Sequence, residues 1–257
     1  MYEKKKVLLA VKAYPELSSK HGETVCTAGI TEDGKWMRMY PVPMELFRGP
    51  HSISKYTWIE VECKKATGEK FNRKESHKIR PGSVKVIDDS LTKKPVDWKK
   101  RNKIILPLLN ESVEQLEEAF ENDRTSLGLI KPETVIDFYE TGDMKDYEKD
   151  INLAIQMTIL GEKRPRLEKL PHMFRYRFRC PIDNCRKHDM TCEDWELFQS
   201  FRSWRFKYPD HKTLWEKIYQ RYYIDFTQKY DLYFYMGTHS LYKTWMIIGL
   251  YYPRKGV

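Results

Sequence analysis

Short runs of alternating apolar and polar residues dominate the first part of the chain and predict a β-rich start. The runs are rich in Val, Ile and aromatic residues, and turn signals such as "EDGK" and "RPGS" separate several of them. The strands that we expect cover 6–14, 24–30, 35–42, 56–65 and 83–88. Five short strands in about 90 residues are typical of a small barrel or a rolled sheet.

One of these strands, "KWMRMY", has a distinctive alternation. Trp36, Arg38 and Tyr40 share one face, and the two methionines between them share the other, where they suit a core. An aromatic–Arg–aromatic row is the pattern with which sheet proteins stack bases and neutralise phosphates. The same row also fits two aromatic rings packed beneath a helix with an arginine reaching past them to solvent. The sequence leaves both interpretations open.

The middle of the chain is acidic and begins with a predicted helix. In 110–124 apolar residues recur at helical spacing, and Ser112 with Gln115 forms a capping-box pattern. A short strand is expected at 135–139, followed by a polar, acidic run with the character of a connector. The uncharged stretch 151–161 fits a buried strand or a buried helix, because its periodicity does not decide between them.

A basic stretch at 162–180 leads into a strand with strict alternation. One face of this strand carries three aromatic rings and the other carries three arginines. The rings belong to Phe174, Tyr176 and Phe178, and the arginines are Arg175, Arg177 and Arg179. Guanidinium groups about 7 Å apart along a strand repel one another unless an anion lies across them, and phosphate fits that spacing. The alternative is that they pair with the acidic middle of the chain.

Two helices and two strands are expected after this region. Asp194 lies where it can cap a helix with aromatic residues three positions apart. A second helix is predicted at 211–230, with an aromatic stripe that is more typical of a core than of a base-stacking surface. The apolar runs 231–237 and 244–253 then predict a closing pair of strands.

Three of the five cysteines lie close together with a histidine. The stretch "CPIDNCRKHDMTC" places Cys180, Cys185, His188 and Cys192 in a C-x4-C-x2-H-x3-C array. Three thiolates and one imidazole suit tetrahedral zinc. The array resembles a zinc knuckle with altered spacing. Because the spacing differs, the fourth ligand is either Cys192 or a residue from elsewhere, for instance His172 or His239. We predict a structural zinc, with unligated buried cysteines and a catalytic zinc as alternatives.

Charge is distributed unevenly along the chain, whose formal net charge is +9. Residues 1–109 carry 23 Lys and Arg against 13 Asp and Glu, residues 110–150 carry 4 against 13, and residues 151–257 carry 19 against 11. Two basic blocks around an acidic one suit a protein whose ends face a polyanion such as nucleic acid. A generally lysine-rich proteome explains the same charge equally well.

The pattern predicts neither secretion nor membrane contact. The apolar run Val7–Val11 is too short for a signal peptide, and no other stretch approaches the roughly 20 apolar residues of a membrane span. An odd number of cysteines, 5, with three of them clustered favours a reducing compartment over a disulfide framework. We therefore expect a cytoplasmic protein.

The stretch "GETVCTAGITEDGKWMRMYPV" carries a family resemblance. With its flanks, at about 6–45, it resembles the opening of uncharacterised prokaryotic proteins with OB-fold-like domains, in which a Cys-x-Ala-Gly-Ile strand, a turn and a Trp-x-Arg strand recur. The resemblance implies a small barrel that binds nucleic acid, and it brings no catalytic residues with it.

The sequence lacks the P-loop, the Rossmann glycine pattern, G-x-S-x-G and H-E-x-x-H. A nuclease-like E-x-K is present at Glu62 to Lys64, but no partner Asp can be identified for it. The stretch 72–82 gathers charged side chains that fit a phosphate-binding loop, acid–base chemistry around His77, or a solvated basic loop. They are Arg73, Lys74, Glu75, His77 and Arg80.

Together these patterns predict an α+β protein of three parts. They are an N-terminal small, OB-like β-barrel at 1–109, an acidic helical connector at 110–161, and a C-terminal zinc-stabilised α/β domain at 162–257. The predicted function is binding of nucleic acid, RNA or single strands in particular, through sheet aromatics and basic surfaces. The alternatives are a metal-dependent nuclease or nucleotide-processing enzyme, with Glu60 and Glu62 in a carboxylate cluster, and an interaction module with a protein partner. The predicted nucleic-acid-binding residues are Trp36, Arg38, Tyr40, Arg73, Lys74, Arg80, Lys163, Arg164, Arg166, Arg175, Arg177 and Arg179, and the predicted zinc ligands are Cys180, Cys185, His188 and Cys192.

Overall fold

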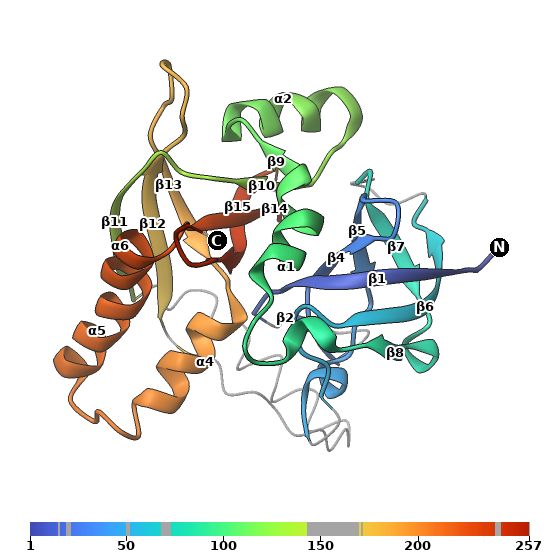
Figure 1. The fold of residues 1–257 in the computed structure, drawn as a ribbon, viewed down its shortest axis with the longest axis horizontal. Coiled ribbons are helices and arrows are strands. Elements are labelled where there is room, and N and C mark those ends of the chain that lie inside the picture. Colours follow the sequence, from blue (N-terminus) through green and yellow to red (C-terminus); the bar gives the residue numbers. More distant parts are fainter. Residues whose placement is uncertain are drawn as a thin grey trace.

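The computed structural model describes residues 1–14, 16–18, 22–49, 52–67, 73–142, 170, 172–239 and 243–256 (Figure 1). It is a mixed α+β fold. A closed five-stranded barrel forms the N-terminal part, and a second sheet with helices forms the C-terminal part. The predicted α+β class and the predicted small barrel are confirmed.

The barrel closes because one strand, β6, pairs with both β7 and β1. The strand order is β1 (Glu3–Lys12), β4 (Thr27–Thr31), β5 (Trp36–Tyr40), β7 (Ser76–Ile79) and β6 (Trp58–Lys65), which returns to β1. All neighbours are antiparallel except β5 and β7. Strand β8 (Lys85–Asp88) adds to β6, and β2 (Glu16–Ser18) and β3 (Gly22–Thr24) form a separate hairpin. Alternation fills the barrel with apolar side chains, among them Val7, Leu9, Met37, Met39, Val61 and Cys63.

The second sheet has seven strands in the order β11-β12-β13-β15-β14-β10-β9. They are β9 (Leu109–Asn110), β10 (Leu127–Ile130), β11 (Thr134–Thr141), β12 (Met173–Arg179), β13 (His188–Cys192), β14 (Tyr233–Thr238) and β15 (Trp245–Tyr251). The predicted alternation of β12 is confirmed, because Phe174, Tyr176 and Phe178 are fully buried while the arginines between them face the other way. The buried rings pack against the C-terminal helices, for example Phe174 against Phe198 with ring centroids 5.0 Å apart.

The helices begin where the sequence supplies a capping oxygen. They are α1 (Trp98–Ile105), α2 (Val113–Asp123), α4 (Trp195–Trp204), α5 (His211–Tyr219) and α6 (Phe226–Lys229). The predicted capping residue of α2 is confirmed, since the Ser112 hydroxyl accepts a hydrogen bond from the Gln115 N–H at 3.1 Å. The Asp194 carboxylate caps α4 in the same way, accepting from the Leu197 N–H at 3.0 Å. The helix predicted at 211–230 is divided, because a π-helical turn at Gln220–Asp225 separates α5 from α6.

The barrel and the second sheet share an apolar core. Leu8 and Ile30 lie on the outer face of the barrel, yet they are fully buried because they pack with Leu129 and Tyr235 of the second sheet. Trp36 joins this contact, with its ring edge against Tyr235 at a centroid distance of 5.9 Å. In Figure 1, α1 lies between the barrel and the second sheet. The outer face of β1, β4 and β5 is therefore an internal surface of the molecule.

Two segments have a different structure from the one that the sequence predicted. The stretch 72–82, interpreted as a loop, contains strand β7, which completes the barrel between β5 and β6. The segment 110–161, interpreted as a connector, contains the expected helix as α2 and the expected strand as β11. It differs from a connector because β11, β10 and part of β9 belong to the second sheet. The stretch 151–161, for which strand and helix were both open, lies outside the described residues.

Candidate metal centre and surface sites

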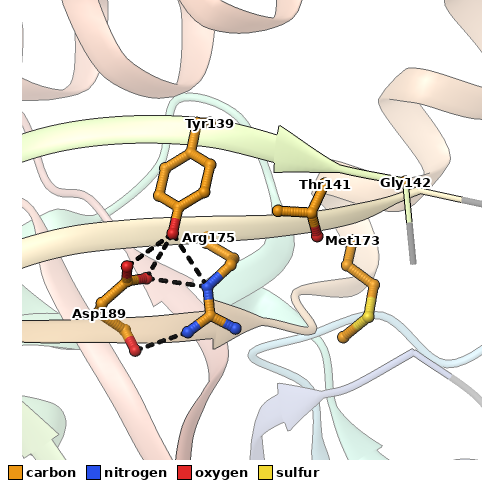
Figure 2. Close-up of a pocket in the computed structure, with 6 residues that line it drawn as sticks. All are labelled: Tyr139, Thr141, Gly142, Met173, Arg175 and Asp189. Carbon is orange, nitrogen blue, oxygen red and sulfur yellow. Dashed lines mark hydrogen bonds and ion pairs between the residues drawn. The ribbon is translucent and has the colours of Figure 1, made fainter.

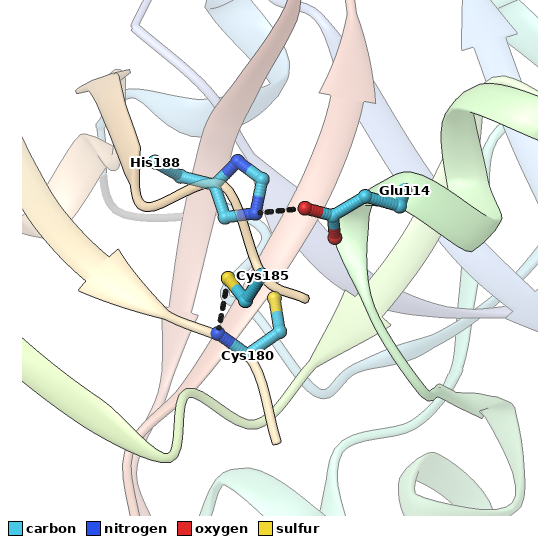
Figure 3. A group of neighbouring side chains, drawn as sticks. All are labelled: Glu114, Cys180, Cys185 and His188. Atoms are coloured by element: carbon cyan, nitrogen blue, oxygen red, sulfur yellow. Dashed lines mark hydrogen bonds and ion pairs between the residues drawn. The ribbon is translucent and has the colours of Figure 1, made fainter. Parts of the chain in front are cut away.

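Four side chains with metal-binding atoms converge in the C-terminal part (Figure 3). Cys180 follows β12, Cys185 lies in the next loop, and His188 begins β13. The fourth, Glu114, comes from the first turn of α2, far upstream in the sequence. One ligand atom from each of the four lies within 4.8 Å of the other three. We call this group, Glu114, Cys180, Cys185 and His188, the cysteine centre.

Several contacts in the cysteine centre suit a bound cation. The Cys180 N–H donates to the Cys185 sulfur at 3.1 Å, a bond that stabilises negative charge on that sulfur. His188 Nε2 lies 3.2 Å from Glu114 Oε1. Even so, His188 Nε2 and Glu114 Oε2 are buried and have no hydrogen-bond partner in the described part of the chain. Buried polar atoms without partners are uncommon, and an ion at the centre would satisfy both.

Burial sets the protonation of these groups in the absence of a cation. It raises the pKa of the Cys180 thiol to about 12 and lowers the pKa of the His188 imidazole, so both are neutral at pH 7. Burial also acts to raise the pKa of Glu114, but hydrogen bonds from the Glu114 and Arg186 backbone outweigh it and leave that pKa below its ordinary value. The centre thus holds a carboxylate, a neutral imidazole and a Cys180 thiol that a metal ion would deprotonate.

The fourth predicted ligand, Cys192, does not belong to the cysteine centre. It lies at the far end of β13 from His188, opposite Phe174, where it is fully buried in the apolar core. Neither substitute takes its place: among the described residues, His172 groups with Glu140 and His211, and His239 belongs to neither group. The sequence offered no spacing signal for Glu114, because only the packing of α2 against the β12–β13 turn brings it there.

Two arginines of β12, Arg175 and Arg177, face carboxylates on the neighbouring strands. Arg175 Nε donates to Asp189 at 2.8 Å and to the Tyr139 hydroxyl at 3.2 Å (Figure 2). Arg177 Nε donates to the other Asp189 oxygen at 3.0 Å. Arg177 also lies 3.8 Å from Asp137, which belongs to the acidic middle of the chain. Only the Asp137 contact corresponds to the alternative in which the arginines pair with the acidic middle of the chain, because Asp189 lies outside that segment. The hollow in Figure 2, about 510 Å³ in volume, is lined by Tyr139, Thr141, Gly142, Met173, Arg175 and Asp189.

The predicted row on β5 divides between an internal and an exposed part. The Arg38 side chain is only 2% exposed and donates to the Ser126 carbonyl at 2.9 Å and to the Cys26 sulfur at 3.1 Å. Arg38 therefore joins the barrel to the second sheet and does not lie on an accessible surface. Trp36 is half-buried in the same contact. Tyr40, at the end of β5, is 40% exposed.

Tyr40 begins a row of side chains that crosses the outer face of the barrel. Tyr40 pairs with Lys78 on β7, and Lys78 pairs with Lys64 on β6. Residues that pair directly across strands point to the same face, so these three side chains are neighbours outside the barrel. Beyond Lys64 lies the Tyr2 ring, with its centroid 5.2 Å from Lys64 Nζ and 4.2 Å from the Arg80 guanidinium. We call the set Tyr2, Tyr40, Lys64, Lys78 and Arg80 the barrel row.

The other predicted binding residues lie apart. Arg73 is half-buried near the Thr238 carbonyl, and exposed Lys74 forms an ion pair with Asp123. Arg179 is exposed at the end of β12. Lys163, Arg164 and Arg166 lie outside the described residues.

The residues considered for catalysis have structural partners. Glu60 and Glu62 form ion pairs with Lys4 at 3.3 Å and with Arg80 at 2.7 Å. His77 Nδ1 lies 2.8 Å from the Glu75 carbonyl oxygen, and burial lowers the pKa of its imidazole. Glu75 is itself buried, and its carboxylate accepts from the Ser126 hydroxyl at 2.7 Å. This arrangement ties β7 to the second sheet. Among the described residues, no group of three or more metal-binding side chains includes Glu60 or Glu62.

No helix in the described ranges is both long and apolar enough to cross a bilayer.

Comparisons with known proteins give two family matches and no further relatives. No curated protein and no solved structure matches the chain. A family model described as a domain of unknown function (DUF8758) matches residues 3–107, and neither family description names an OB fold or a zinc knuckle. A second model, a domain of unknown function (DUF8757), matches residues 109–257, which is more than half of the chain, and the protein therefore belongs to the DUF8757 family.

Proposed function

We propose that this protein binds single-stranded nucleic acid, RNA in particular, along the barrel row, and that a structural zinc ion occupies the cysteine centre. The observation that carries the first part is the cross-strand alignment of Tyr40, Lys78 and Lys64 on the outside of the barrel. It is extended by Tyr2 and Arg80, so aromatic rings lie at both ends of a cationic stretch.

Single-strand binders need this combination of groups. Rings stack bases without regard to their identity, and flanking cations neutralise the phosphates. The barrel itself is consistent with an OB-like fold, a class that binds oligonucleotides on the outer face of its sheet. In this chain the outer face of β1, β4 and β5 is internal, and the binding face is therefore assigned to the other side, where β5, β7 and β6 meet.

The charges of the barrel row also suit a phosphate. Lys78 and Lys64 pair with each other across β7 and β6, so two positive charges lie side by side. A phosphate near both lysines would be attracted by the two charges together. Arg175 and Arg177 share the Asp189 carboxylate, and Arg80 of the barrel row pairs with Glu62, so we assign the phosphate contacts to the two lysines.

The test is a salt titration of binding to a fluorescently labelled single-stranded RNA, with single-stranded DNA and duplex RNA of the same sequence as comparisons. The Tyr40→Ala variant should weaken binding by about 1–3 kcal/mol, the usual contribution of one stacked base. The Lys64→Ala/Lys78→Ala variant should flatten the dependence of log K on log salt by about 0.7 for each lysine removed.

A matched control is Lys99→Ala/Lys217→Ala, which removes two exposed lysines from α1 and α5. It should leave both affinity and salt slope unchanged. Equal losses in the two double variants would show that binding follows net charge alone, and the barrel row would then not be the site. Salt-insensitive association with a protein, without RNA binding, would favour the interaction-module alternative.

The zinc proposal rests on the donor set of the cysteine centre. Two sulfurs, one imidazole nitrogen and one carboxylate oxygen are four ligands, which fill a tetrahedral site. A site with four protein ligands is structural in type, whereas a catalytic zinc keeps one position for water. Such an ion would fix the start of α2 to the β12–β13 turn. All five cysteines are free thiols, which agrees with the proposed cytoplasmic location.

Elemental analysis of the untagged protein tests this assignment. About one zinc per chain is expected at the cysteine centre, and Glu114→Gln, which keeps the size of the side chain but removes its charge, should weaken its retention during chelator dialysis. Glu118→Gln on the same helix, outside the centre, is the control. A metal content that neither Glu114→Gln nor Cys185→Ser changes would overturn the assignment.

A further inference from the structure

A second group of metal-binding side chains lies on the helix-covered side of β11 and β12. Glu140 is on β11, His172 directly precedes β12, and His211 is the first residue of α5. Glu140 pairs with Phe174, and Phe174 lies two residues from His172. Strand alternation therefore places the side chains of Glu140, Phe174 and His172 on the same face of the sheet. Phe201 of α4 packs against the His172 ring at a centroid distance of 4.9 Å. We call Glu140, His172 and His211 the histidine centre.

The two imidazoles face different oxygens of one carboxylate. His172 Nδ1 is 3.3 Å from Glu140 Oε2, and His211 Nε2 is 3.1 Å from Glu140 Oε1. One ligand atom from each of the three lies within 4.8 Å of the others. Two atoms bound to the same zinc ion at 2.0–2.1 Å in tetrahedral geometry are about 3.3 Å apart, so the observed separations fit two atoms bound to one ion.

A hydrogen-bonded network without metal accounts less well for this geometry. Glu140 Oε2 is buried and has no hydrogen-bond partner in the described part of the chain, although His172 Nδ1 is close to it. The nitrogen and the oxygen are thus near each other without being aligned for a hydrogen bond. A nitrogen and an oxygen that both point toward a metal ion between them are close to each other but poorly aligned for a hydrogen bond. This is the arrangement of His172 Nδ1 and Glu140 Oε2.

We propose that the histidine centre binds a divalent transition-metal ion, with zinc as the natural test ion. Two imidazoles and one carboxylate are a borderline ligand set that suits zinc or iron(II) and lacks sulfur, in contrast to the cysteine centre. Three ligands from the described residues leave at least one position of the ion for water or another ligand. A zinc site with three protein ligands and one open position is of the catalytic type, in which a bound metal polarises a substrate oxygen or lowers the pKa of a bound water.

This inference does not depend on the proposed nucleic-acid binding, and it can be separated from the zinc assignment of the cysteine centre. The full-length protein is stripped with chelator and titrated with Zn²⁺ and Co²⁺, with the bound metal counted by elemental analysis after desalting. Two zinc ions per chain are expected. His172→Ala/His211→Ala should lose one of them, and the Co²⁺ spectrum should keep the thiolate charge-transfer band of the cysteine centre while losing bands without thiolate character.

A single substitution at an exposed ligand separates loss of the metal from loss of the fold. His211 is 54% exposed, so His211→Asn should preserve the fold while weakening retention of the same ion at least tenfold. His239→Ala, outside both centres, is the matched control and should retain both ions. If the protein binds one ion per chain, and that ion is lost in His172→Ala/His211→Ala but kept in Cys185→Ser, the histidine centre is supported. The zinc assignment of the cysteine centre would then be wrong. Metal content and retention that neither histidine variant changes would overturn the proposal.

Discussion

Lys55, in the turn before β6, and Asp194, the capping residue of α4, form a buried ion pair, with Lys55 Nζ 3.2 Å from Asp194 Oδ2 and side chains only 7% and 1% exposed. The same carboxylate caps α4 and accepts from the Leu250 N–H of β15 at 3.0 Å. Burial acts to lower the pKa of Lys55, but the carboxylates of Asp194 and Glu196 outweigh it and raise that pKa well above its ordinary value. One carboxylate thus connects the barrel, α4 and β15.

Removing the charge of Asp194 should destabilise the whole molecule. Asp194→Asn keeps a capping oxygen for α4 but removes one of the two carboxylates that pair with the buried Lys55 ammonium, and leaves Glu196, 2.5 Å from Lys55 Nζ, as the other. Breaking a buried pair costs about 3–5 kcal/mol, and we expect a loss of up to that amount. Denaturant unfolding measures the change. Asp89→Asn, which breaks the exposed Lys93–Asp89 pair, is the control and should change stability by less than about 1 kcal/mol. Equal effects would show that the buried pair has no special role.

Lys12 should make stability rise with pH in the alkaline range. It is 8% exposed, with Nζ 4.5 Å from the Phe47 ring centroid and 4.7 Å from that of Trp195. Burial lowers its pKa from 10.5 to about 8, partly opposed by Glu196. Between these pH values the unfolded chain binds the proton and the folded chain does not, so the free energy of unfolding rises with pH. The full rise is at most about 3 kcal/mol.

The Lys12→Met variant isolates this contribution from other alkaline titrations. It should be more stable than the wild type at pH 7, because a buried charge is replaced by an apolar chain of similar length. The difference between the two proteins should shrink as pH rises from 8 to 10.5. A constant difference across this range would mean that Lys12 keeps its proton in the folded state.

Gly29, in the Cys-x-Ala-Gly-Ile stretch of β4, should not tolerate a side chain. A Cβ at this position would lie 2.4 Å from Val7 Cγ1 and 2.5 Å from the Leu8 carbonyl oxygen. The carbonyl cannot move without disturbing the β1–β4 pairing, so Gly29→Ala should cost about 1–3 kcal/mol or more. Gly82→Ala, where nothing lies within 4 Å of the new Cβ, should have almost no effect on the melting temperature.

Cys185→Ser and Cys192→Ser should separate metal binding from packing. The first removes a ligand of the cysteine centre and should reduce metal content. The second places a hydroxyl in the apolar core, should cost about 1–3 kcal/mol, and should leave metal content unchanged. Loss of metal in both variants would restore the ligand set expected from sequence spacing, in which Cys185 and Cys192 are both ligands.

Local patterns predicted the elements of the fold that have a clear period. The barrel strands β1, β4, β5 and β6, the alternation of β12 and the caps at Ser112 and Asp194 follow from neighbouring residues and were expected. Strand β7 was missed because "SHKI" has one apolar residue, Ile79, which packs in the barrel core. Helix α1 was not anticipated, although Asp97 caps it by accepting from the Lys100 N–H.

The candidate sites were harder to predict because they depend on contacts between distant parts of the chain. Sequence spacing brought Cys180, Cys185 and His188 together, but Glu114 reaches them only through the packing of α2. Alternation placed Arg38 on the outer face of β5 correctly, yet the second sheet covers that face. No local rule indicates which side of a barrel another domain will occupy.

The two family matches border on residue 108, but the apolar core is not divided between them. Leu8 and Ile30 from one match and Leu129 and Tyr235 from the other form a single apolar cluster. A protein cut between the matches would expose an apolar surface on each part, and exposed apolar surfaces cause aggregation. An exchange of one segment alone between genes would leave its apolar surface without the partner segment that buries it. We therefore expect the two segments to be inherited together in one gene.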